Sequence, residues 1–354
     1  MRLTRLVLKN FRNYQNLEVS LNSDLVLILG ENAAGKTNLL ESIYFLSRLK
    51  SFRAPDELLV NLTQDFFAIQ AQFGNLDLET VVQKSGIVKR SFKINNQKTK
   101  RSLWHSFTTV LFVPNDLNLF ILGPVFRRKF LDEILTQKDP VYAVNVASLD
   151  HVLKQRAALL QLLSRGEGQR SELDFWNQEL AVSSLAIWRK RKELIEFLNQ
   201  KFSSTNQNLT GFNHNYQIEF VSQSQIQSRE EFLAELVRLE TAEIRSCKNL
   251  LGPHKDDFLI KKNNELNIYN SSRGELRAQI LALKLLQAEY LTEGENKPII
   301  LLDDVFSELD EVRRTKLLES LQGHQIFITS TEEHHLPKLH KDVLVLKVEN
   351  NQVR

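Results

Sequence analysis

Residues 30–37 read GENAAGKT, between the aliphatic run LVLIL (25–29) and the segment NLLESIYFL (38–46). The aliphatic run has the length of a buried parallel strand, and leucine and isoleucine recur after the motif at helical spacing. A strand, a glycine-rich loop and a helix form the setting in which G-x-x-x-x-G-K-T binds phosphate. We therefore expect an α/β domain built around a phosphate-binding loop.

Each residue type of the loop has a physical role in that setting. The two glycines permit positive φ angles and let main-chain N–H groups close around phosphate at a helix N-terminus, where the dipole favours negative charge. The lysine is predicted to reach the β- and γ-phosphates, and the threonine hydroxyl to ligate Mg²⁺. The expected nucleotide-binding residues are Gly30, Glu31, Asn32, Ala33, Ala34, Gly35, Lys36 and Thr37.

The composition is that of a globular protein. The 354 residues are 42% hydrophobic and 25% charged, which is enough for two or three domains. Cys247 is the only cysteine, which excludes an intrachain disulfide and favours a cytosolic setting. Because no apolar run reaches membrane-spanning length and the N-terminus lacks a signal-peptide core, we expect a cytoplasmic protein without a membrane partner.

A run of basic residues without acidic ones lies between residues 84 and 101. The overall charge of +3 does not by itself indicate a nucleic-acid partner. Alternation around the pair Asn95–Asn96 predicts a hairpin with the basic side chains on one face. The segment is either a DNA-binding surface or a solvated hairpin. Its basic residues are Lys84, Lys89, Arg90, Lys93, Lys98, Lys100 and Arg101.

The pattern changes from strands to long helices and back along the chain. We expect residues 1–124 and 252–354 to form an α/β head with a β-rich subdomain at about 60–113, and residues 125–251 to form an inserted helical arm. A helix over 171–198 would be roughly 40 Å long and would carry the basic residues Arg189 to Lys192. The stretches 164–170 and 204–215 are predicted to be loops.

A second motif, PIILLDD (298–304), ends an aliphatic strand with two aspartates. Ligands bind at the carboxyl ends of parallel strands, so we assign Asp303 to Mg²⁺ and Asp304 to orienting or deprotonating the attacking water. The alternative is a capped strand-to-helix turn. A guanine-binding N-K-x-D motif is missing from the sequence, since Asn296-Lys297 precedes Pro298, and adenine is therefore favoured.

A third motif, Ser272-Arg273-Gly274, stands directly before an amphipathic stretch that extends to Leu291. A serine and a glycine at a helix N-terminus can bind phosphate from a second surface. The same residues are also those of an ordinary helix N-cap. The spacing of 29 residues from Gly274 to Asp303 favours the phosphate-binding interpretation.

The order of these motifs, closed by IFITST (326–331), resembles the ATP-binding-cassette ATPases, and specifically the RecF branch of the SMC/Rad50-like DNA repair group. The segments that share the resemblance are TRLVLKNFRNY (4–14), KSFR (50–53), VLFVPNDLNL (110–119), RRKFLDEIL (127–135) and LGPHKDDF (251–258). They span nearly the whole chain.

The resemblance implies an ATP-dependent homodimer with two ATP molecules in its interface. The signature residues Ser272, Arg273, Gly274 and Glu275 of one subunit would contact the γ-phosphate held by Lys36 of the other. Asp310 would belong to the D-loop that crosses between the two sites. The Q-loop would fall near Asn115–Asp116. Thr329 to Thr331 would occupy the switch-histidine position, with His334 and His335 a few residues later.

The resemblance further implies a clamp on DNA that acts in recombinational repair, replication restart and the SOS response. It would help to load RecA at gaps together with RecR and RecO. The catalytic residues would be Lys36, Asp303 and Asp304. Asp304 stands where the family usually has glutamate, and a carboxylate displaced by over an ångström can cost about a hundredfold in rate. We therefore expect a weak, DNA-stimulated ATPase in which ATP acts as a timer.

Three other functions fit the phosphate loop alone. A transporter ATPase would have a much shorter insertion between Lys36 and Ser272. A long-armed SMC or Rad50 relative would need heptads sustained over hundreds of residues, and the insertion has about 125. A small-molecule kinase would use Ser272 only as an N-cap, and ATP-dependent dimerisation separates this alternative from the cassette ATPase.

Overall fold

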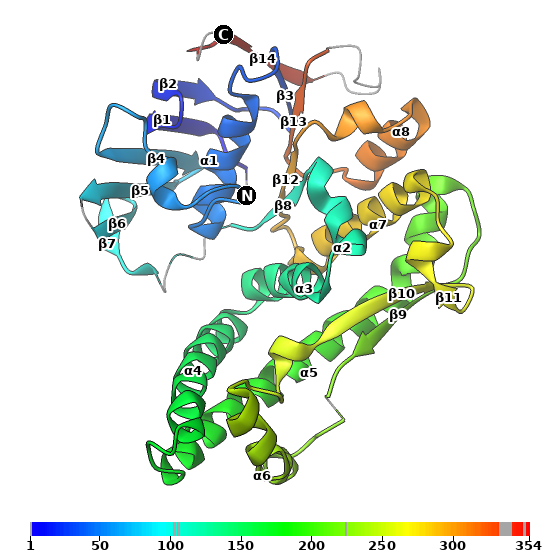
Figure 1. Cartoon of the computed structure of the whole chain (residues 1–354). Coiled ribbons are helices and arrows are strands. Elements are labelled where there is room, and N and C mark those ends of the chain that lie inside the picture. The colour runs from blue at the N-terminus through cyan, green and yellow to red at the C-terminus, as the bar shows by residue number, and fades with distance from the viewer. Residues whose placement is uncertain are drawn as a thin grey trace. The chain divides into compact units, whose positions relative to one another are not determined.

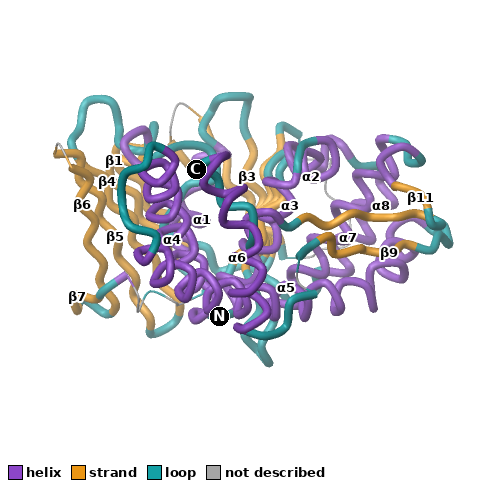
Figure 2. The backbone as a smooth tube through the Cα atoms, turned by 60° about the horizontal axis from the view of Figure 1, so that its bottom comes forward, coloured by secondary structure: helices purple, strands orange, loops and turns teal. Residues whose placement is uncertain are grey.

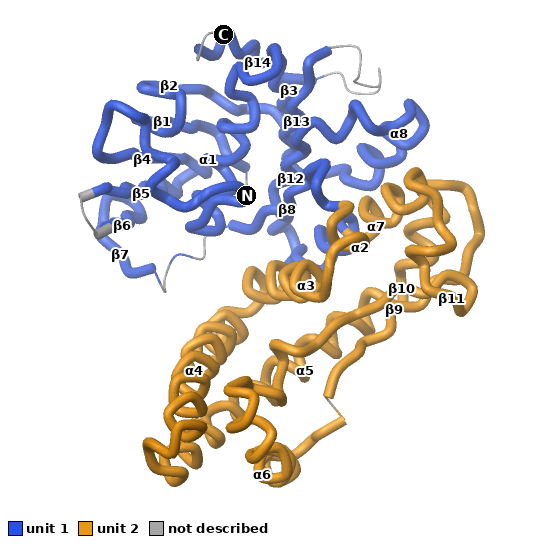
Figure 3. Tube along the Cα trace, in the orientation of Figure 1, with its two compact units in different colours: residues 1–116, 284–354 blue, residues 117–283 orange. Residues whose placement is uncertain are grey.

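The computed structural model describes residues 2–85, 87–101, 104, 107–223, 225–332, 342–349 and 352–354. The chain forms two compact units (Figure 3). Unit 1 comprises residues 1–116 and 284–354, and unit 2 comprises residues 117–283.

Unit 1 is built on a six-stranded sheet whose central strands are parallel (Figure 1). Its order is β15-β14-β3-β13-β12-β8, and all neighbours except β14 and β15 run parallel. Every residue of β3, β12, β13 and β8 is buried, which agrees with their largely apolar sequences in a sheet covered on both faces. The strands are β3 (Leu25–Leu29), β8 (Thr109–Phe112), β12 (Ile299–Leu302), β13 (Ile326–Ser330), β14 (Val343–Glu349) and β15 (Gln352–Val353).

A second, antiparallel sheet of unit 1 has the order β2-β1-β4-β5-β6-β7. One hydrophobic core joins its inner face to α1 (Lys36–Arg48) and to the parallel sheet, and Figure 1 shows α1 between the two. Unlike the β-rich subdomain expected at about 60–113, this sheet takes in the first strands of the chain and leaves out β8. Its strands are β1 (Arg5–Phe11), β2 (Tyr14–Ser20), β4 (Phe66–Phe73), β5 (Leu76–Ser85), β6 (Ile87–Ile94) and β7 (Gln97–Thr99).

Unit 2 consists mainly of helices, with one small antiparallel sheet of order β11-β10-β9 (Figure 2). Its helices are α2 (Asn118–Ile121), α3 (Pro124–Lys138), α4 (Pro140–Ser164), α5 (Ser171–Thr210) and α6 (Arg229–Ser246), and its strands are β9 (Tyr216–Val221), β10 (Asp257–Lys262) and β11 (Glu265–Leu266). The helix α7 (Arg273–Leu291) begins in unit 2 and ends in unit 1, and α8 (Glu311–Ser320) lies in unit 1.

Three boundaries differ from the sequence prediction. The expected loop at 204–215 is wrong over its first part, because α5 continues to Thr210 and buries Phe202, Asn206 and Leu209 before ending at Gly211 with a φ of 77°. The compact units divide at residues 116 and 283, whereas the sequence analysis placed the divisions at 124 and 251. Residues 252–283 group with unit 2 because β10 pairs along its whole length with β9.

Candidate nucleotide-binding site

The loop between β3 and α1 requires both of its glycines. Gly35 has a φ of 112°, a conformation that residues with a side chain rarely adopt. A Cβ on Gly30 would lie 2.5 Å from the Val348 carbonyl oxygen, and a Cβ on Gly35 would lie 2.5 Å from Asn13 Nδ2. Ala33 also has a positive φ, of 66°. The main chain therefore turns tightly here, with no room for larger residues at either glycine.

Lys36, the first residue of α1, curls back over this loop. Its Nζ donates hydrogen bonds to the carbonyl oxygens of Gly30, at 2.8 Å, and Glu31, at 3.0 Å. The side chain is 4% exposed. A buried ammonium group is thus held against the loop that was predicted to bind phosphate.

Thr37, Asp303 and Thr329 meet at the carboxyl ends of three parallel strands. Thr37 Oγ1 donates to Asp303 Oδ1 at 2.8 Å, and Thr329 Oγ1 donates to the same oxygen at 2.9 Å. Burial raises the pKa of Asp303, the two hydroxyl hydrogen bonds oppose that shift, and the charge of Asp304 adds to it. A buried carboxylate beside a threonine hydroxyl is a donor set that suits Mg²⁺.

Asp304 follows in a strained conformation. Its φ of 51° lies in the left-handed region, which aspartate tolerates better than most residues. Its main-chain N–H donates to Thr329 Oγ1 at 2.9 Å, so the turn is held by the neighbouring strand. Strain of this kind often marks functional sites.

A set of side chains that supports the phosphate loop through hydrogen bonds was not predicted from the sequence. Tyr14 Oη donates to the Gly35 carbonyl oxygen at 3.1 Å, and Asn13 Nδ2 donates to the Ala34 carbonyl oxygen at 3.4 Å. Asn38 Nδ2 in turn donates to Asn13 Oδ1 at 2.7 Å. These contacts join residues distant in sequence, so no spacing pattern indicates them.

A buried ion-pair cluster adjoins this set of side chains. Glu41 on α1 is fully buried and accepts hydrogen bonds from Arg12 Nη2 at 2.9 Å and Arg53 Nη2 at 2.6 Å. Burial alone would raise the pKa of Glu41, but the hydrogen bonds from Arg12, Arg53 and Ser51 hold the pKa below its usual range. Arg53 also donates to Asn38 Oδ1 at 2.6 Å. In the sequence, the only sign of this cluster is that Glu41 lies within the apolar segment after the loop.

The predicted signature residues lie at the start of α7, in unit 2. Ser272 N–H donates to Glu275 Oε2 at 2.8 Å, and Glu275 N–H donates to Ser272 Oγ at 3.3 Å, which is a capping box. Hydrogen bonds from Lys262 and Ser272 lower the pKa of Glu275 to about 2. The box uses an acceptor site of the Ser272 hydroxyl and leaves its proton available.

Two other predicted segments have local partners. Asp310 caps α8, since its side chain accepts from the Arg313 N–H at 2.8 Å. Asp116 accepts from the Val113 N–H at 2.8 Å and lies 3.2 Å from the buried Lys284 Nζ. His334 and His335 lie outside the described residues.

The basic segment does form the predicted turn, with positive φ angles at Asn95 and Asn96. The expectation of a single basic face is wrong, because alternation along β6 puts Lys89 and Lys93 on the opposite face from Arg90. Arg90 forms an ion pair with the nearly buried Asp56 at 2.5 Å.

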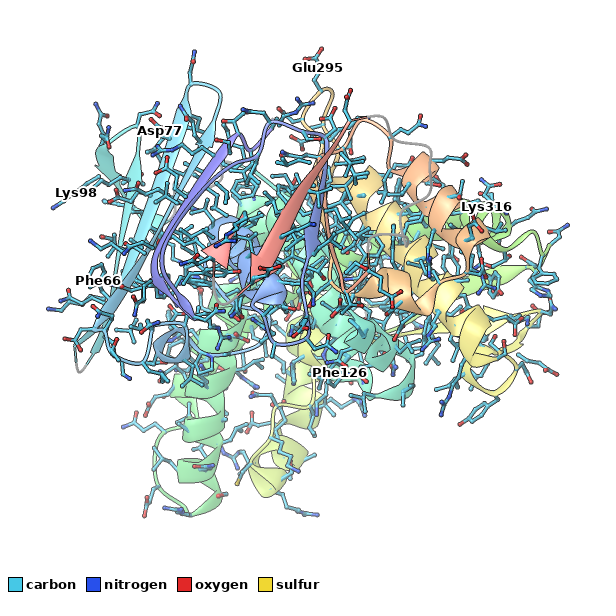
Figure 4. The ribbon with its side chains drawn as sticks, turned by 90° about the horizontal axis from the view of Figure 1, so that it is seen from above. Phe66, Asp77, Lys98, Phe126, Glu295 and Lys316 are labelled. Atoms are coloured by element: carbon cyan, nitrogen blue, oxygen red, sulfur yellow. The ribbon has the colours of Figure 1, made fainter. Side chains whose placement is uncertain are left out.

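The outer face of the antiparallel sheet keeps part of the predicted charge. Lys89 and Lys98 are exposed, and Figure 4 shows Lys98 pointing away from the sheet. Lys93 Nζ lies 2.6 Å from Glu79, which partly neutralises this surface. Lys84, Lys100 and Arg101 are exposed at the ends of this segment.

The basic cluster on α5 is not a surface patch. Arg191 is 2% exposed, and its guanidinium group forms ion pairs with Asp256 at 2.7 Å and Asp132 at 2.9 Å. Trp188 Nε1 donates to the same Asp256 at 3.0 Å. Arg189 is exposed and lies 3.3 Å from Glu193, whereas Lys190 and Lys192 are half-buried and Lys190 pairs with Asp139.

Two features of the described residues bear on the class of protein. No helix among them is long and apolar enough to cross a membrane. Within the same residues, no group of three or more histidine, cysteine, aspartate or glutamate side chains could hold a metal ion by itself. A magnesium ion here would need phosphate and water as further ligands, which is how Mg²⁺ usually binds beside nucleotides.

Comparisons with known proteins show the family of this chain. The family model described as the RecF/RecN/SMC N terminal domain matches residues 2–354. The DNA replication and repair protein RecF of Moorella thermoacetica is 35% identical over 340 residues, which cover 95% of this chain and 91% of the relative. The chain belongs to the RecF family. The RecF of Streptococcus suis strain 05ZYH33 is 34% identical, with 100% of this chain and 99% of the relative covered.

Solved RecF structures have the same fold. The recombination mediator protein RecF bound to ATP, from the RecFOR pathway, superposes with a TM-score of 0.88 at 28% identity, covering 99% of this chain and 96% of the other. An SMC head bound to the C-winged helix domain of ScpA superposes with a TM-score of 0.57 at 12% identity, covering 100% of this chain and 97% of the other. That second likeness concerns the fold alone. The expected α/β cassette-type ATPase fold with an inserted helical part is therefore confirmed, and the RecF family is one of SMC-type ATPases.

Proposed function

We propose that this RecF-family chain is an ATP-dependent DNA clamp that acts in recombinational repair, replication restart and the SOS response. The observation that carries the proposal is the convergence of Thr37 and Thr329 on the buried Asp303, beside a loop over which Lys36 is folded. The ATP complex of the related RecF supports adenine as the base. A single cysteine fits a cytoplasmic setting.

The residues fit a magnesium–ATP complex. Main-chain N–H groups of residues 30–37 would bind the phosphates, with Lys36 at the β- and γ-phosphates. Thr37 and Asp303 would hold Mg²⁺, which when bound neutralises charge on the phosphates. Asp304 would orient or deprotonate the attacking water. Because it replaces the longer glutamate, we propose slow hydrolysis that DNA stimulates.

The dimer would complete each site. The Ser272 to Glu275 segment of a second copy would bind the γ-phosphate, and the capping box supports this role by fixing the hydroxyl with its proton free. Asp310 would lie in the loop that crosses between the sites. The relative is named as a recombination mediator of the RecFOR pathway, and we propose RecR, RecO and RecA as pathway partners of this chain.

DNA would be held through its phosphate backbone. The candidate contacts are the exposed lysines of the antiparallel sheet, chiefly Lys89 and Lys98. Backbone neutralisation by lysine releases counterions, so affinity should fall steeply with salt.

Sedimentation of the full chain with ATP, with ADP and as Lys36→Met, each with and without duplex DNA, tests the proposal. We expect a dimer only with ATP, DNA binding by that dimer, and neither in Lys36→Met. Lys316→Met, on α8, is the control and should behave like the parent chain. A chain that stays monomeric with ATP and DNA would overturn the clamp.

A further inference from the structure

A buried polar cluster holds the loop that leads into Ser272. Asn267 and Gln279 are 1% and 0% exposed, and Asn267 Nδ2 donates to Gln279 Oε1. Gln279 Nε2 lies within hydrogen-bond distance of Asn267 Oδ1, at 3.1 Å, and of Tyr216 Oη, at 3.3 Å. Ser271 Oγ donates to Asn267 Oδ1 at 2.6 Å. The side chains of α7, β9 and the loop are thus joined in one network.

A second set of contacts fixes the same loop from its outer side. Lys262 Nζ donates to a carboxylate oxygen of Glu275 and, at 3.3 Å, to the Asn270 carbonyl oxygen. His214 Nε2 lies 3.6 Å from the same Glu275 oxygen. Asn270, two residues before Ser272, and Glu275, three residues after it, are therefore both anchored to the small sheet or its flanks.

The cluster serves the loop and not the helix itself. Gln287 is another fully buried glutamine of α7, and among the described residues its amide nitrogen and oxygen have no hydrogen-bond partner. The helix thus tolerates a buried glutamine without any network around it. What distinguishes Gln279 is that its partners lie on the loop and on β9, so its amide ties the loop to the helix.

We propose that Gln279 is a positioning residue, which together with Asn267 fixes the Ser272 cap in its phosphate-binding geometry before a second subunit arrives. This inference rests on the proposed function of the Ser272 segment. A loop ordered in advance loses less conformational freedom when the dimer forms, so the dimer is favoured without any added contact. The network also turns Asn267 inward while Ile268 and Tyr269, which are 39% and 82% exposed, stay outside.

In this proposal the network of Asn267 and Gln279 does not affect nucleotide binding by Lys36 of the same subunit. Loosening the loop should therefore weaken dimerisation and catalysis but leave ATP binding by a single subunit unchanged. A general loss of packing would instead lower the stability of the whole chain. It would not weaken dimerisation while leaving ATP binding by the single subunit unchanged.

The test compares Gln279→Leu with Gln287→Leu, the same change at two buried positions of one helix. ATP affinity of the monomer, ATP-dependent sedimentation, and the KM and kcat of hydrolysis are measured on the full chain. For Gln279→Leu we expect dimer affinity and kcat to fall by about ten- to a hundredfold, as misplacement of about 1 Å can cause. Monomer ATP affinity should not change, and Gln287→Leu should match the parent chain in every assay.

Asn267→Ala, which leaves α7 intact, is the second variant if Gln279→Leu does not fold, and the same losses are expected. Parent-like dimerisation in Gln279→Leu or Asn267→Ala, or equal losses in Gln279→Leu and Gln287→Leu, would overturn the inference. Ser272→Ala separates the two proposals. If Ser272→Ala dimerises normally with ATP, the proposed role of the Ser272 segment in the dimer fails. If Ser272→Ala is defective and Gln279→Leu is not, only the positioning role of Gln279 fails.

Discussion

Thr329 Oγ1 donates to Asp303 Oδ1 across 2.9 Å and at the same time accepts the main-chain N–H of Asp304. The pairing follows from register, since Leu302 lies opposite Ile328 on parallel strands and the next residues adjoin. One hydroxyl thus ties both acidic residues of the candidate site to β13.

Thr329→Val should separate catalysis from binding. Valine keeps the strand and the side-chain volume but leaves the Asp304 N–H without its acceptor. A donor left unpaired in this way costs about 1–3 kcal/mol of stability when it is shielded from water. We expect ATP hydrolysis to fall at least about tenfold, with nucleotide affinity nearly unchanged in a binding titration. Thr329→Ser, which retains the hydroxyl, should keep most activity; a fully active Thr329→Val would contradict this assignment.

Asp304→Asn is expected to trap the ATP-bound dimer. Asparagine tolerates the φ of 51° and keeps the shape of the side chain, so the turn should survive while the carboxylate that orients water is lost. Dimer lifetime after ATP addition, followed by light scattering, should increase as turnover stops. Unchanged turnover in this variant would refute the role of Asp304.

The Mg²⁺-dependent affinity for ATP should depend on pH through the ionisation of Asp303. Burial raises the pKa of this carboxyl, so between its ordinary value of 3.8 and the raised pKa the folded chain carries a proton that the unfolded chain has released. The contribution of Asp303 to stability is therefore present at acid pH and is lost as pH rises through that window. Mg²⁺ needs the ionised form, so the Mg²⁺-dependent part of ATP affinity should increase with pH over the same window. Calorimetric titration of Asp303→Asn at the same pH values should show no such increase.

Arg191 should matter for stability and not for DNA binding. Removing it leaves Asp132 and Asp256 without their cation, and loss of one partner of a buried pair costs about 3–5 kcal/mol. Urea unfolding of Arg191→Leu should show that loss, while the exposed Arg189→Leu should stay within about 0.5 kcal/mol of the parent chain. An Arg191→Leu chain as stable as the parent would contradict the network.

Charge reversal at Lys89 and Lys98 should weaken DNA binding without loss of ATP binding. Each lost phosphate contact should lower the slope of log affinity against log salt by about one. The measurement is fluorescence anisotropy of labelled duplex DNA with ATP over a salt series. Lys297→Glu is the control, because Lys297 instead contacts the Gln322 carbonyl oxygen in another part of unit 1. Equal slopes for the parent chain, the charge-reversal variant and Lys297→Glu would show that DNA binds to another surface.

The sequence was sufficient for the features that local pattern determines. The strand at residues 25–29, the loop, α1 and the strand that delivers Asp303 all follow from hydrophobic periodicity and motif spacing. The convergence of Thr37 with Asp303 was foreseeable too, because the loop before Thr37 and Asp303 itself each follow the carboxyl end of a parallel strand.

The features that needed the structure depend on contacts between distant segments. Arg12, Glu41 and Arg53 come together only because the first strands fold against α1, and Arg191 looked like part of a basic surface until its buried acidic partners were placed. Alternation gave the hairpin turn at Asn95–Asn96, but it also divides the basic residues between two faces. Charge counts along the chain cannot distinguish a paired cation from a free one.

The position of β3 between β13 and β14 has a consequence for biosynthesis. Both neighbours of this early strand come from residues 326–349, far later in the chain, and the carbonyl oxygen of Val348 lies close to Gly30. On the ribosome, the nascent chain must therefore keep its phosphate loop unassembled until β13 and β14 have been translated. Long-range pairing of this kind slows folding and leaves apolar strand edges open to aggregation in the meantime.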